Sequence, residues 1–279
     1  MKIFREVSEI RAHLAQIRRE GKAIGLVPTM GALHRGHATL VEKAHQECPH
    51  VVVSIFVNPL QFGPNEDYSR YPQAFESDVR ICEAKGGDAI FAPETSAMYP
   101  APQITFAEVT GMSDYLCGAF RKGHFRGVTT VVLKLFNIVQ PDRAYFGEKD
   151  YQQLRVIGRM VEDLNLPIEI VGVPTVREPD GLALSSRNAY LSAEERTVAP
   201  ALFKSLQLAK DAIERGERDS GKIKENAASV LSAEPLVRVE YFEIVDPASL
   251  QLVFRIDGPV RIASAIWLGK TRLIDNVPA

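Results

Sequence analysis

Strongly apolar, strand-like segments alternate with amphipathic, helix-like segments over residues 1–175. The segment His50–Val57 constrains the fold most, because its Val-Val-Val-Ser-Ile-Phe-Val run is rich in β-branched residues and lacks polar alternation. Such a run predicts a strand that is buried on both faces, as in a parallel sheet covered by helices. Ala23–Val27 and the shorter Asp88–Phe91 have the same character. The alternation therefore predicts an α/β protein with a doubly wound, mostly parallel sheet.

The segments between these strands show helical spacing of apolar residues. Ser8 is the expected N-cap of the first helix, which Gly21 ends. Further helices are expected at about Gln73–Lys85, Val128–Val139 and Lys149–Leu164, with strands at Ala144–Phe146 and Ile168–Val173. Together they predict a Rossmann-like domain over residues 1–175.

The pattern changes after Pro174. Glu178–Gly181 predicts a tight turn, and Ser192 begins a helix that is expected to run to Arg215, with acidic residues in its first turn. A charged helix at about 219–232 is followed by strand-like segments at Val237–Val245, Val260–Leu268 and Arg272–Asp275. We therefore predict a second, smaller α+β domain over residues 176–279.

The composition is that of an ordinary globular protein: the 279 residues are 46% hydrophobic and 24% charged, with a formal net charge of -2. A nucleic-acid surface needs clustered Lys and Arg, so this charge argues against one. No apolar run reaches membrane-spanning length, and Met1–Glu6 becomes charged too early for a signal peptide. The three widely spaced cysteines predict reduced thiols rather than disulfides or a zinc site, which favours the cytoplasm.

The segment Pro28–His37 joins a predicted strand to a predicted helix and contains two glycines. Such a junction is expected to leave unpaired backbone N–H groups and the positive end of the helix dipole facing one crevice. His34 and His37 are three residues apart, so they should lie on one face of a helical turn. A single histidine is more often structural, but two histidines at such a turn predict a phosphate site.

Two further turns follow predicted strands, and such turns converge at the carboxyl ends of a doubly wound sheet. In one, the amides of Asn58 and Gln61 can orient a polar substrate, although such amides are also common in plain loops. In the other, Lys149 offers a compact cation for phosphate oxygens, and Gln153, four residues on, should share its face. A solvated charged turn is an equally good interpretation of the second segment.

Two stretches elsewhere offer groups for anions. Ser185–Arg187 combines two hydroxyls with a guanidinium, which suits a phosphate chain, and a surface turn is the alternative. Arg121–Arg126 is a basic loop that can attract anions, although a solvated loop is favoured there.

The sequence favours no resident metal. The spacing of His34 and His37 suits a metal pair, but no third ligand stands at a supporting distance along the chain. Mg²⁺ carried by nucleotide phosphates is favoured instead, because it keeps waters and needs few protein ligands. No G-x-G-x-x-G segment occurs, which disfavours the usual dinucleotide cofactors.

Four segments, in chain order, closely resemble the pantoate–β-alanine ligase (pantothenate synthetase) family: Pro28–His37, Phe56–Phe62, Phe146–Gln153 and Ser185–Asn188. The resemblance spans nearly the whole chain. Through it, His34–His37 is similar to the HIGH motif, and Leu184–Arg187 to the KMSKS-type loop, of the nucleotidyltransferase superfamily shared with class I aminoacyl-tRNA synthetases. Leu184 stands where the family usually has Met, a change of similar volume that should matter little.

The resemblance implies an ATP-dependent condensation of pantoate with β-alanine, through a pantoyl adenylate, with release of pyrophosphate and AMP. It also implies Mg²⁺, a homodimer, and a second domain that closes as a lid. The implied ATP-binding residues are Met30, Gly31, Ala32, Leu33, His34, Arg35, Gly36, His37, Gly147, Glu148, Lys149, Asp150, Val176, Leu184, Ser185, Ser186 and Arg187. The implied catalytic residues among them are His34, His37 (the candidate proton donor), Lys149, Ser185, Ser186 and Arg187. The implied substrate-binding residues are Asn58, Gln61 and Gln153.

Two other functions stay open on the residues alone. A nucleotidyltransferase that joins a nucleotide to a phosphorylated small molecule would also fit the histidine turn, and it would form a nucleotidylated product instead of AMP. An RNA-binding module related to the synthetases is disfavoured by the near-neutral charge, and salt-sensitive binding of tRNA would support it.

Overall fold

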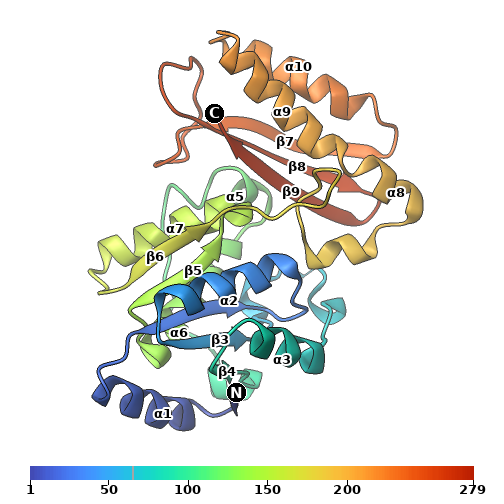
Figure 1. The fold of residues 1–279 in the computed structure, drawn as a ribbon. Helices are drawn as coiled ribbons and strands as arrows, with labels where there is room; N and C mark the ends of the chain where they lie inside the picture. The colour runs from blue at the N-terminus through green and yellow to red at the C-terminus, as the bar shows by residue number, and fades with distance from the viewer. Residues whose placement is uncertain (65) are drawn as a thin grey trace. The chain divides into compact units, whose positions relative to one another are not determined.

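The computed structural model describes residues 1–64 and 66–279 (Figure 1). Asn65 lies outside the described residues. Contacts divide the chain into two compact units. The first comprises Met1–Ser113, Arg121–Glu148 and Gln153–Pro174, and the second comprises Asp114–Phe120, Lys149–Gln152 and Thr175–Ala279. Two short segments from the first two-thirds of the chain thus belong to the second unit.

The first unit is built on a six-stranded parallel sheet in the order β1-β4-β3-β2-β5-β6. Its strands are β1 Lys2–Phe4, β2 Ile24–Thr29, β3 His50–Ile55, β4 Ala89–Phe91, β5 Arg143–Gly147 and β6 Glu169–Val173. The strand order reverses between β2 and β5, so the predicted doubly wound sheet is confirmed. The sequence pattern does not predict β1, because its three residues are mostly exposed and become a strand only by pairing with β4.

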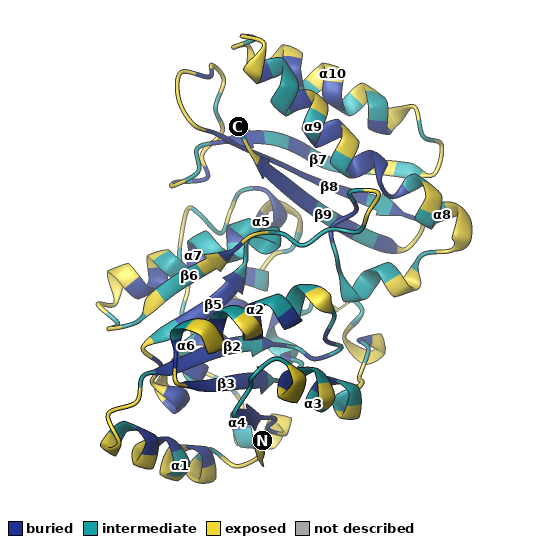
Figure 2. Cartoon of the chain, in the orientation of Figure 1, coloured by how far each residue is buried: buried dark blue, intermediate teal, exposed yellow. Residues whose placement is uncertain are grey.

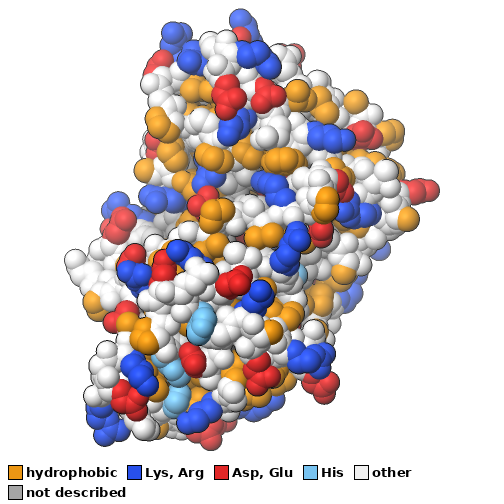
Figure 3. Space-filling view, in the orientation of Figure 1, with side chains coloured by type: hydrophobic (Ala, Val, Ile, Leu, Met, Phe, Trp, Pro, Cys, Tyr) orange, Lys and Arg blue, Asp and Glu red, His pale blue; other side chains and the backbone are white. Residues whose placement is uncertain are grey.

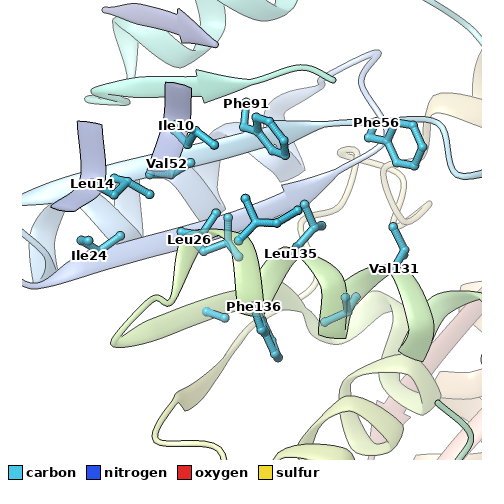
Figure 4. Packing of buried hydrophobic residues seen from close by; sticks show 14 of the residues in the cluster. Ile10, Leu14, Ile24, Leu26, Val52, Phe56, Phe91, Val131, Leu135 and Phe136 are labelled. Atoms are coloured by element: carbon cyan, nitrogen blue, oxygen red, sulfur yellow. The ribbon is translucent and has the colours of Figure 1, made fainter. Parts of the chain in front are cut away.

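Helices bury both faces of this sheet. One face carries α1 Val7–Arg19, α6 His124–Val139 and the part of α7 (Tyr151–Asp163) from Gln153 onward. Figure 4 shows Ile10 and Leu14 of α1 and Leu135 of α6 packed around strand side chains. The other face carries α2 Arg35–Glu47 and α3 Phe75–Ala84. Burial on both faces explains why the sequences of these strands are continuous apolar runs.

Shorter elements complete the first unit: 3₁₀ turns η1 Pro59–Gln61 and η2 Tyr68–Arg70, and helix α4 Thr95–Met98. The predicted start of α1 is wrong, because Glu6 rather than Ser8 is its N-cap, and Glu6 makes no side-chain cap. Val7 packs against the core, so burial of this apolar residue places the helix start ahead of the better capping residue.

The second unit contains a three-stranded antiparallel sheet, β7 Val237–Val245, β8 Arg261–Leu268 and β9 Thr271–Pro278. Its other elements are α5 Cys117–Phe120, the part of η3 (Glu148–Asp150) from Lys149 onward, the start of α7, η4 Ser186–Tyr190, α8 Ala193–Val198, α9 Ala201–Glu214 and α10 Ser220–Ser232. The helix predicted from Ser192 to Arg215 is in fact two helices. Its capping box between Ser192 and Glu195 is present, but Pro200 has no N–H to continue α8.

Different segments pack on the two faces of this small sheet. Helices α9 and α10 pack on one face, where Leu206, Ile223 and Ile266 are buried in one cluster. Figure 2 shows strand β8 and much of β9 in the colour of buried residues. Residues on the other face meet the early segments: Phe120 stacks on Tyr241 with ring centroids 5.8 Å apart. The second face of the sheet therefore also makes a contact within its own unit.

Candidate active site

Three of the predicted segments begin at one edge of the six-stranded sheet. Met30 follows β2, Asn58 lies just beyond β3, and Glu148 follows β5. Because β3, β2 and β5 are adjacent and parallel, their carboxyl ends meet at the point where the strand order reverses. The structure thus brings the histidine turn, the amide loop and the start of the Gly147–Asp150 turn to one edge.

The turn after β2 is held by a buried carboxylate that the sequence does not reveal. Asp78 of α3, 1% exposed, accepts hydrogen bonds from the backbone N–H groups of Ala32 at 3.0 Å and Leu33 at 2.7 Å. Burial raises the pKa of Asp78, and the two N–H donors oppose that rise. The amides expected to face a phosphate are therefore already paired here. Gly31 takes φ +84°, the left-handed conformation that suits glycine in such a turn.

His34 and His37 cap helix α2. His34 is the N-cap rather than a helical residue, and its Nδ1 accepts from the N–H of Gly36 at 3.1 Å. His37 reaches back, and its Nδ1 accepts from the N–H of His34 at 3.4 Å. The ring centroids lie 4.1 Å apart, so the two side chains do lie together, although through capping and not through helical spacing. An Nδ1 that accepts leaves the proton of the neutral ring on Nε2, which makes each Nε2–H a donor.

Asn58 and Gln61 form one buried amide pair. Asn58 is 1% exposed, and its Oδ1 caps η1 and accepts from the hydroxyl of Tyr99 at 2.8 Å. Its Nδ2 donates to the carbonyl of Gly127 and to Oε1 of Gln61, both at 3.1 Å. This contact orients the Gln61 amide, whose Nε2 donates to Sδ of Met30 at 3.0 Å. Asn58 therefore positions Gln61.

The basic loop is solvated in part, because Lys122, Gly123 and Arg126 are exposed, but Arg121 and His124 contact the amide loop. Arg121 pairs with Glu66, with 2.8 Å between Nε and Oε1, and its NH2 donates to the carbonyl of Gln61 at 3.3 Å. His124 accepts from Arg121 at Nε2 and donates through Nδ1 to the same carbonyl at 2.8 Å. The paired residues are 55–63 positions apart, so no local sequence pattern predicts these contacts.

Lys149 lies in a 3₁₀ turn, not in the helix predicted to begin there. The turn η3 ends at Asp150 and α7 begins at Tyr151, so the four-residue spacing argument does not apply to Lys149 and Gln153. The Lys149 side chain is 19% exposed, and its Nζ lies 3.7 Å from Oδ2 of Asp150. Gln153 is half-buried in the first turn of α7. Lys149 belongs to the second unit and Gln153 to the first.

Val176 and Leu184 lie at the base of a hairpin in the second unit. The N–H of Leu184 donates to the carbonyl of Val176 at 3.0 Å, so that carbonyl is already paired. The loop that follows is ordered by Ser185, which is the N-cap of η4 and accepts from the N–H of Arg187 at 3.3 Å. Ser186 begins that 3₁₀ turn.

Three observations concern metal ligands, surface charge and membrane-spanning helices. Over the described part of the chain, no group of three or more His, Cys, Asp or Glu side chains is arranged to hold a metal ion. On the face shown in Figure 3, Lys and Arg are interspersed with Asp and Glu. Within the same described residues, no helix combines the length and apolar character that a bilayer crossing requires.

Comparisons with known proteins cover essentially the whole chain. The family model described as pantoate-beta-alanine ligase matches residues 2–278. The pantothenate synthetases of Moorella thermoacetica and Enterococcus faecalis are 53% and 54% identical to the chain, and each match covers 99% of this chain and 98% of the relative. The crystal structure of pantothenate synthetase from Thermus thermophilus matches with a TM-score of 0.94 and 48% identity over 99% of both chains. Pantoate-beta-alanine ligase from Francisella tularensis, solved with beta-gamma ATP and beta-alanine, matches with a TM-score of 0.81 and 34% identity over 99% of this chain and 97% of that one.

Proposed function

Because the chain belongs to the pantoate–β-alanine ligase family and is an ATP-dependent ligase, we propose that the segments described above bind ATP and pantoate and carry out adenylation. The observation that carries this assignment is the contact between Gln61 and Met30. It sets an amide suited to a hydroxy acid 3.0 Å from the turn assigned to the nucleotide. An acid and a nucleotide held side by side are what transfer of an adenylyl group requires.

The reaction proceeds in two steps. First, a carboxylate oxygen of pantoate attacks the α-phosphorus of ATP; an O–P bond forms, the bond to the β-phosphate breaks, and pyrophosphate leaves. Next, the amine of β-alanine attacks the acyl carbon of pantoyl adenylate. A C–N bond forms, the C–O bond to AMP breaks, and the proton that the amine loses passes to the phosphate of the departing AMP or to solvent.

The proposed residues stabilise the charge of the phosphates and position the substrates. The Nε2–H groups of His34 and His37 stabilise negative charge on the phosphates, and His37 is the candidate proton donor in the sense that its Nε2–H donates a hydrogen bond and keeps its proton. Lys149 neutralises charge that develops as pyrophosphate leaves, and Ser185, Ser186 and Arg187 bind the phosphate chain. Gln61, oriented by Asn58, binds pantoate and β-alanine, and Gln153 binds pantoate. The remaining ATP contacts come from residues 30–36, 147–150, Val176 and Leu184.

The nucleotide enters as its Mg²⁺ complex. The described chain provides no cluster of three ligands, and Mg²⁺ bound to phosphates keeps waters and needs few protein oxygens. We further propose a cytoplasmic homodimer, with the second unit as a lid that excludes water from the acyl adenylate.

The first test is an assay with ATP, pantoate and β-alanine, repeated with each omitted. We expect pantothenate and AMP only with all three, and pyrophosphate with ATP and pantoate alone. A nucleotidylated product without AMP would instead support a nucleotidyltransferase of another kind.

Lys149→Ala tests the role of the cation. Loss of a charge-assisted contact in the transition state should slow single-turnover pyrophosphate release about 100-fold, because such contacts contribute about 1.5–3 kcal/mol. Lys204→Ala, which removes an exposed lysine from α9, is the matched control and should adenylate like the parent. Near-parental adenylation by Lys149→Ala would remove this residue from the site.

A further inference from the structure

We propose that Asn276, on strand β9, is a positioning residue for Lys149. It acts through a hydrogen bond from its side-chain Nδ2 to the Lys149 carbonyl oxygen, 2.9 Å away. The inference rests on the phosphate role proposed above for Lys149. Asn276 lies 127 residues from Lys149 in the sequence, and both belong to the second unit.

The hydrogen bond is built into a rigid part of the molecule. Asn276 is 5% exposed and pairs with Ala263 in the β8–β9 ladder, which runs without irregularity from Arg261 to Leu268. A buried amide held by a regular ladder can fix a partner precisely, since its own backbone has little freedom.

The turn that carries Lys149 depends on such contacts. Turn η3 has only three residues, and 3₁₀ hydrogen bonds are poorly aligned. Its neighbour Tyr151 is also fastened within the second unit: its hydroxyl donates to the carbonyl of Pro247 at 2.9 Å, and the guanidinium of Arg261 lies 3.8 Å from its ring centroid. The short segment Lys149–Tyr151 is therefore fixed to the small sheet at both of its ends.

The adjacent residue on β9 holds the other phosphate-binding segment. Asp275, on the opposite face of the strand, makes a bidentate pair with Arg177, at 2.5 and 3.0 Å. Arg177 is at the base of the hairpin that leads into Ser185–Arg187. Consecutive residues of one strand thus fasten the backbone at Lys149 and the base of the hairpin that leads to Arg187.

A fixed backbone position for Lys149 should matter more for the rate of adenylation than for the binding of ATP and pantoate. Groups that are held in place before the reaction stabilise developing charge without reorganising, whereas a mobile lysine can still reach a ground-state phosphate. Removal of the Asn276 donor should therefore lower the rate of adenylation and leave the KM values nearly unchanged.

The test uses Asn276→Leu, which keeps the size of the side chain and removes its donor, and Asn276→Ala, which removes the same donor by truncation. We expect both to slow single-turnover adenylation at least tenfold, with KM for ATP and pantoate within about twofold of the parent. Asn226→Leu makes the same change on the exposed face of α10 and should leave the rate unchanged. Parental rates in both Asn276 variants, or a loss of rate that comes entirely through higher KM, would overturn the inference.

A double-mutant cycle separates an effect of Asn276 through Lys149 from an effect that is independent of Lys149. If Asn276 acts through Lys149, Asn276→Leu should have little further effect in a Lys149→Ala background. Effects that multiply would overturn the inference, because they would show that Asn276 acts independently of Lys149. Failure of the proposed function would give a different result. The Lys149→Ala variant would then adenylate at the parental rate, with or without a substitution at Asn276.

Discussion

At the scale of single residues, the two histidines of the turn after β2 cap helix α2 with one ring nitrogen, and the proposed function uses the other. Both Nδ1 atoms accept backbone N–H groups at the start of α2, which is a capping box made by histidines. Capping therefore selects the tautomer that offers Nε2–H to a ligand. Asp78 complements this arrangement, because it pairs the amides of Ala32 and Leu33 and so fixes where α2 starts.

The two uses of His34 can be separated by substitution. Asparagine is a good N-cap, so His34→Asn should change the free energy of unfolding by only a few tenths of a kcal/mol, whereas His34→Ala should lose ~1 kcal/mol. Both variants lack the Nε2–H donor, so both should lose adenylation activity roughly 10-fold or more. Denaturant unfolding and single-turnover kinetics measure the two effects, and parental activity in His34→Asn would show that the residue is only a cap.

At the scale of elements, the position of Gln61 depends on the close approach of η1 to helix α6. Gly127 of α6 accepts from Asn58 through its carbonyl, and a Cβ at this position would lie 2.2 Å from the carbonyl oxygen of Leu60. Only glycine allows the backbones to lie this close. A helix propensity argument alone would favour alanine at the same place.

Gly127→Ala should therefore destabilise the protein, by about 1–3 kcal/mol, despite the better helix propensity of alanine. It should also raise KM for pantoate, because the Asn58–Gln61 pair must shift. Gly158→Ala in α7 is the matched control, since a Cβ there meets nothing within 4 Å, and it should stabilise by up to ~1 kcal/mol. Equal effects of the two substitutions on thermal unfolding would contradict the close-approach argument.

At the scale of the whole molecule, each unit has its own buried core, and the first unit contains two packed histidines outside the site. His13 of α1 is half-buried, stacks on Phe4 and meets the buried His50 of β3 edge-on, with ring centroids 5.0 and 5.2 Å apart. Burial lowers the pKa of both histidines. Charged neighbours are secondary: Lys2 and Lys22 favour the neutral rings, and Asp88 and Glu20 oppose them.

These histidines predict how stability depends on pH. With the folded pKa below the unfolded value of ~6.5, unfolding takes up protons as the pH falls below that value. The contribution of these two histidines to stability should thus be constant above about pH 7 and fall as the pH drops below ~6.5, by up to ~1.4 kcal/mol per pH unit for each proton. His50→Phe keeps the aromatic contact with His13 and should reduce this slope in denaturant titrations. An unchanged slope would rule out His50 as its source.

The sequence by itself determined the class of fold and the places of the turns that we propose as the site. Apolar runs that alternate with amphipathic helices can bury both faces of a sheet only in a doubly wound arrangement, and the turns after β2, β3 and β5 then share one edge. Local patterns of this kind report local structure and burial, which is why β2, β3 and the helix start at Ser192 are found close to where they were expected.

Only the tertiary structure decided what holds those groups in place. Asp78, Arg121 and Asn276 act on residues 45, 60 and 127 positions away, and such distances leave no periodicity or spacing in the sequence. The same holds for the assignment of Lys149 to the second unit, which depends on contacts with β9 rather than on its place in the chain. The sequence shows which side chain stands at each position, but tertiary packing decides which group it contacts. Buried polar groups must be hydrogen-bonded, and their partners are the groups that the fold brings near.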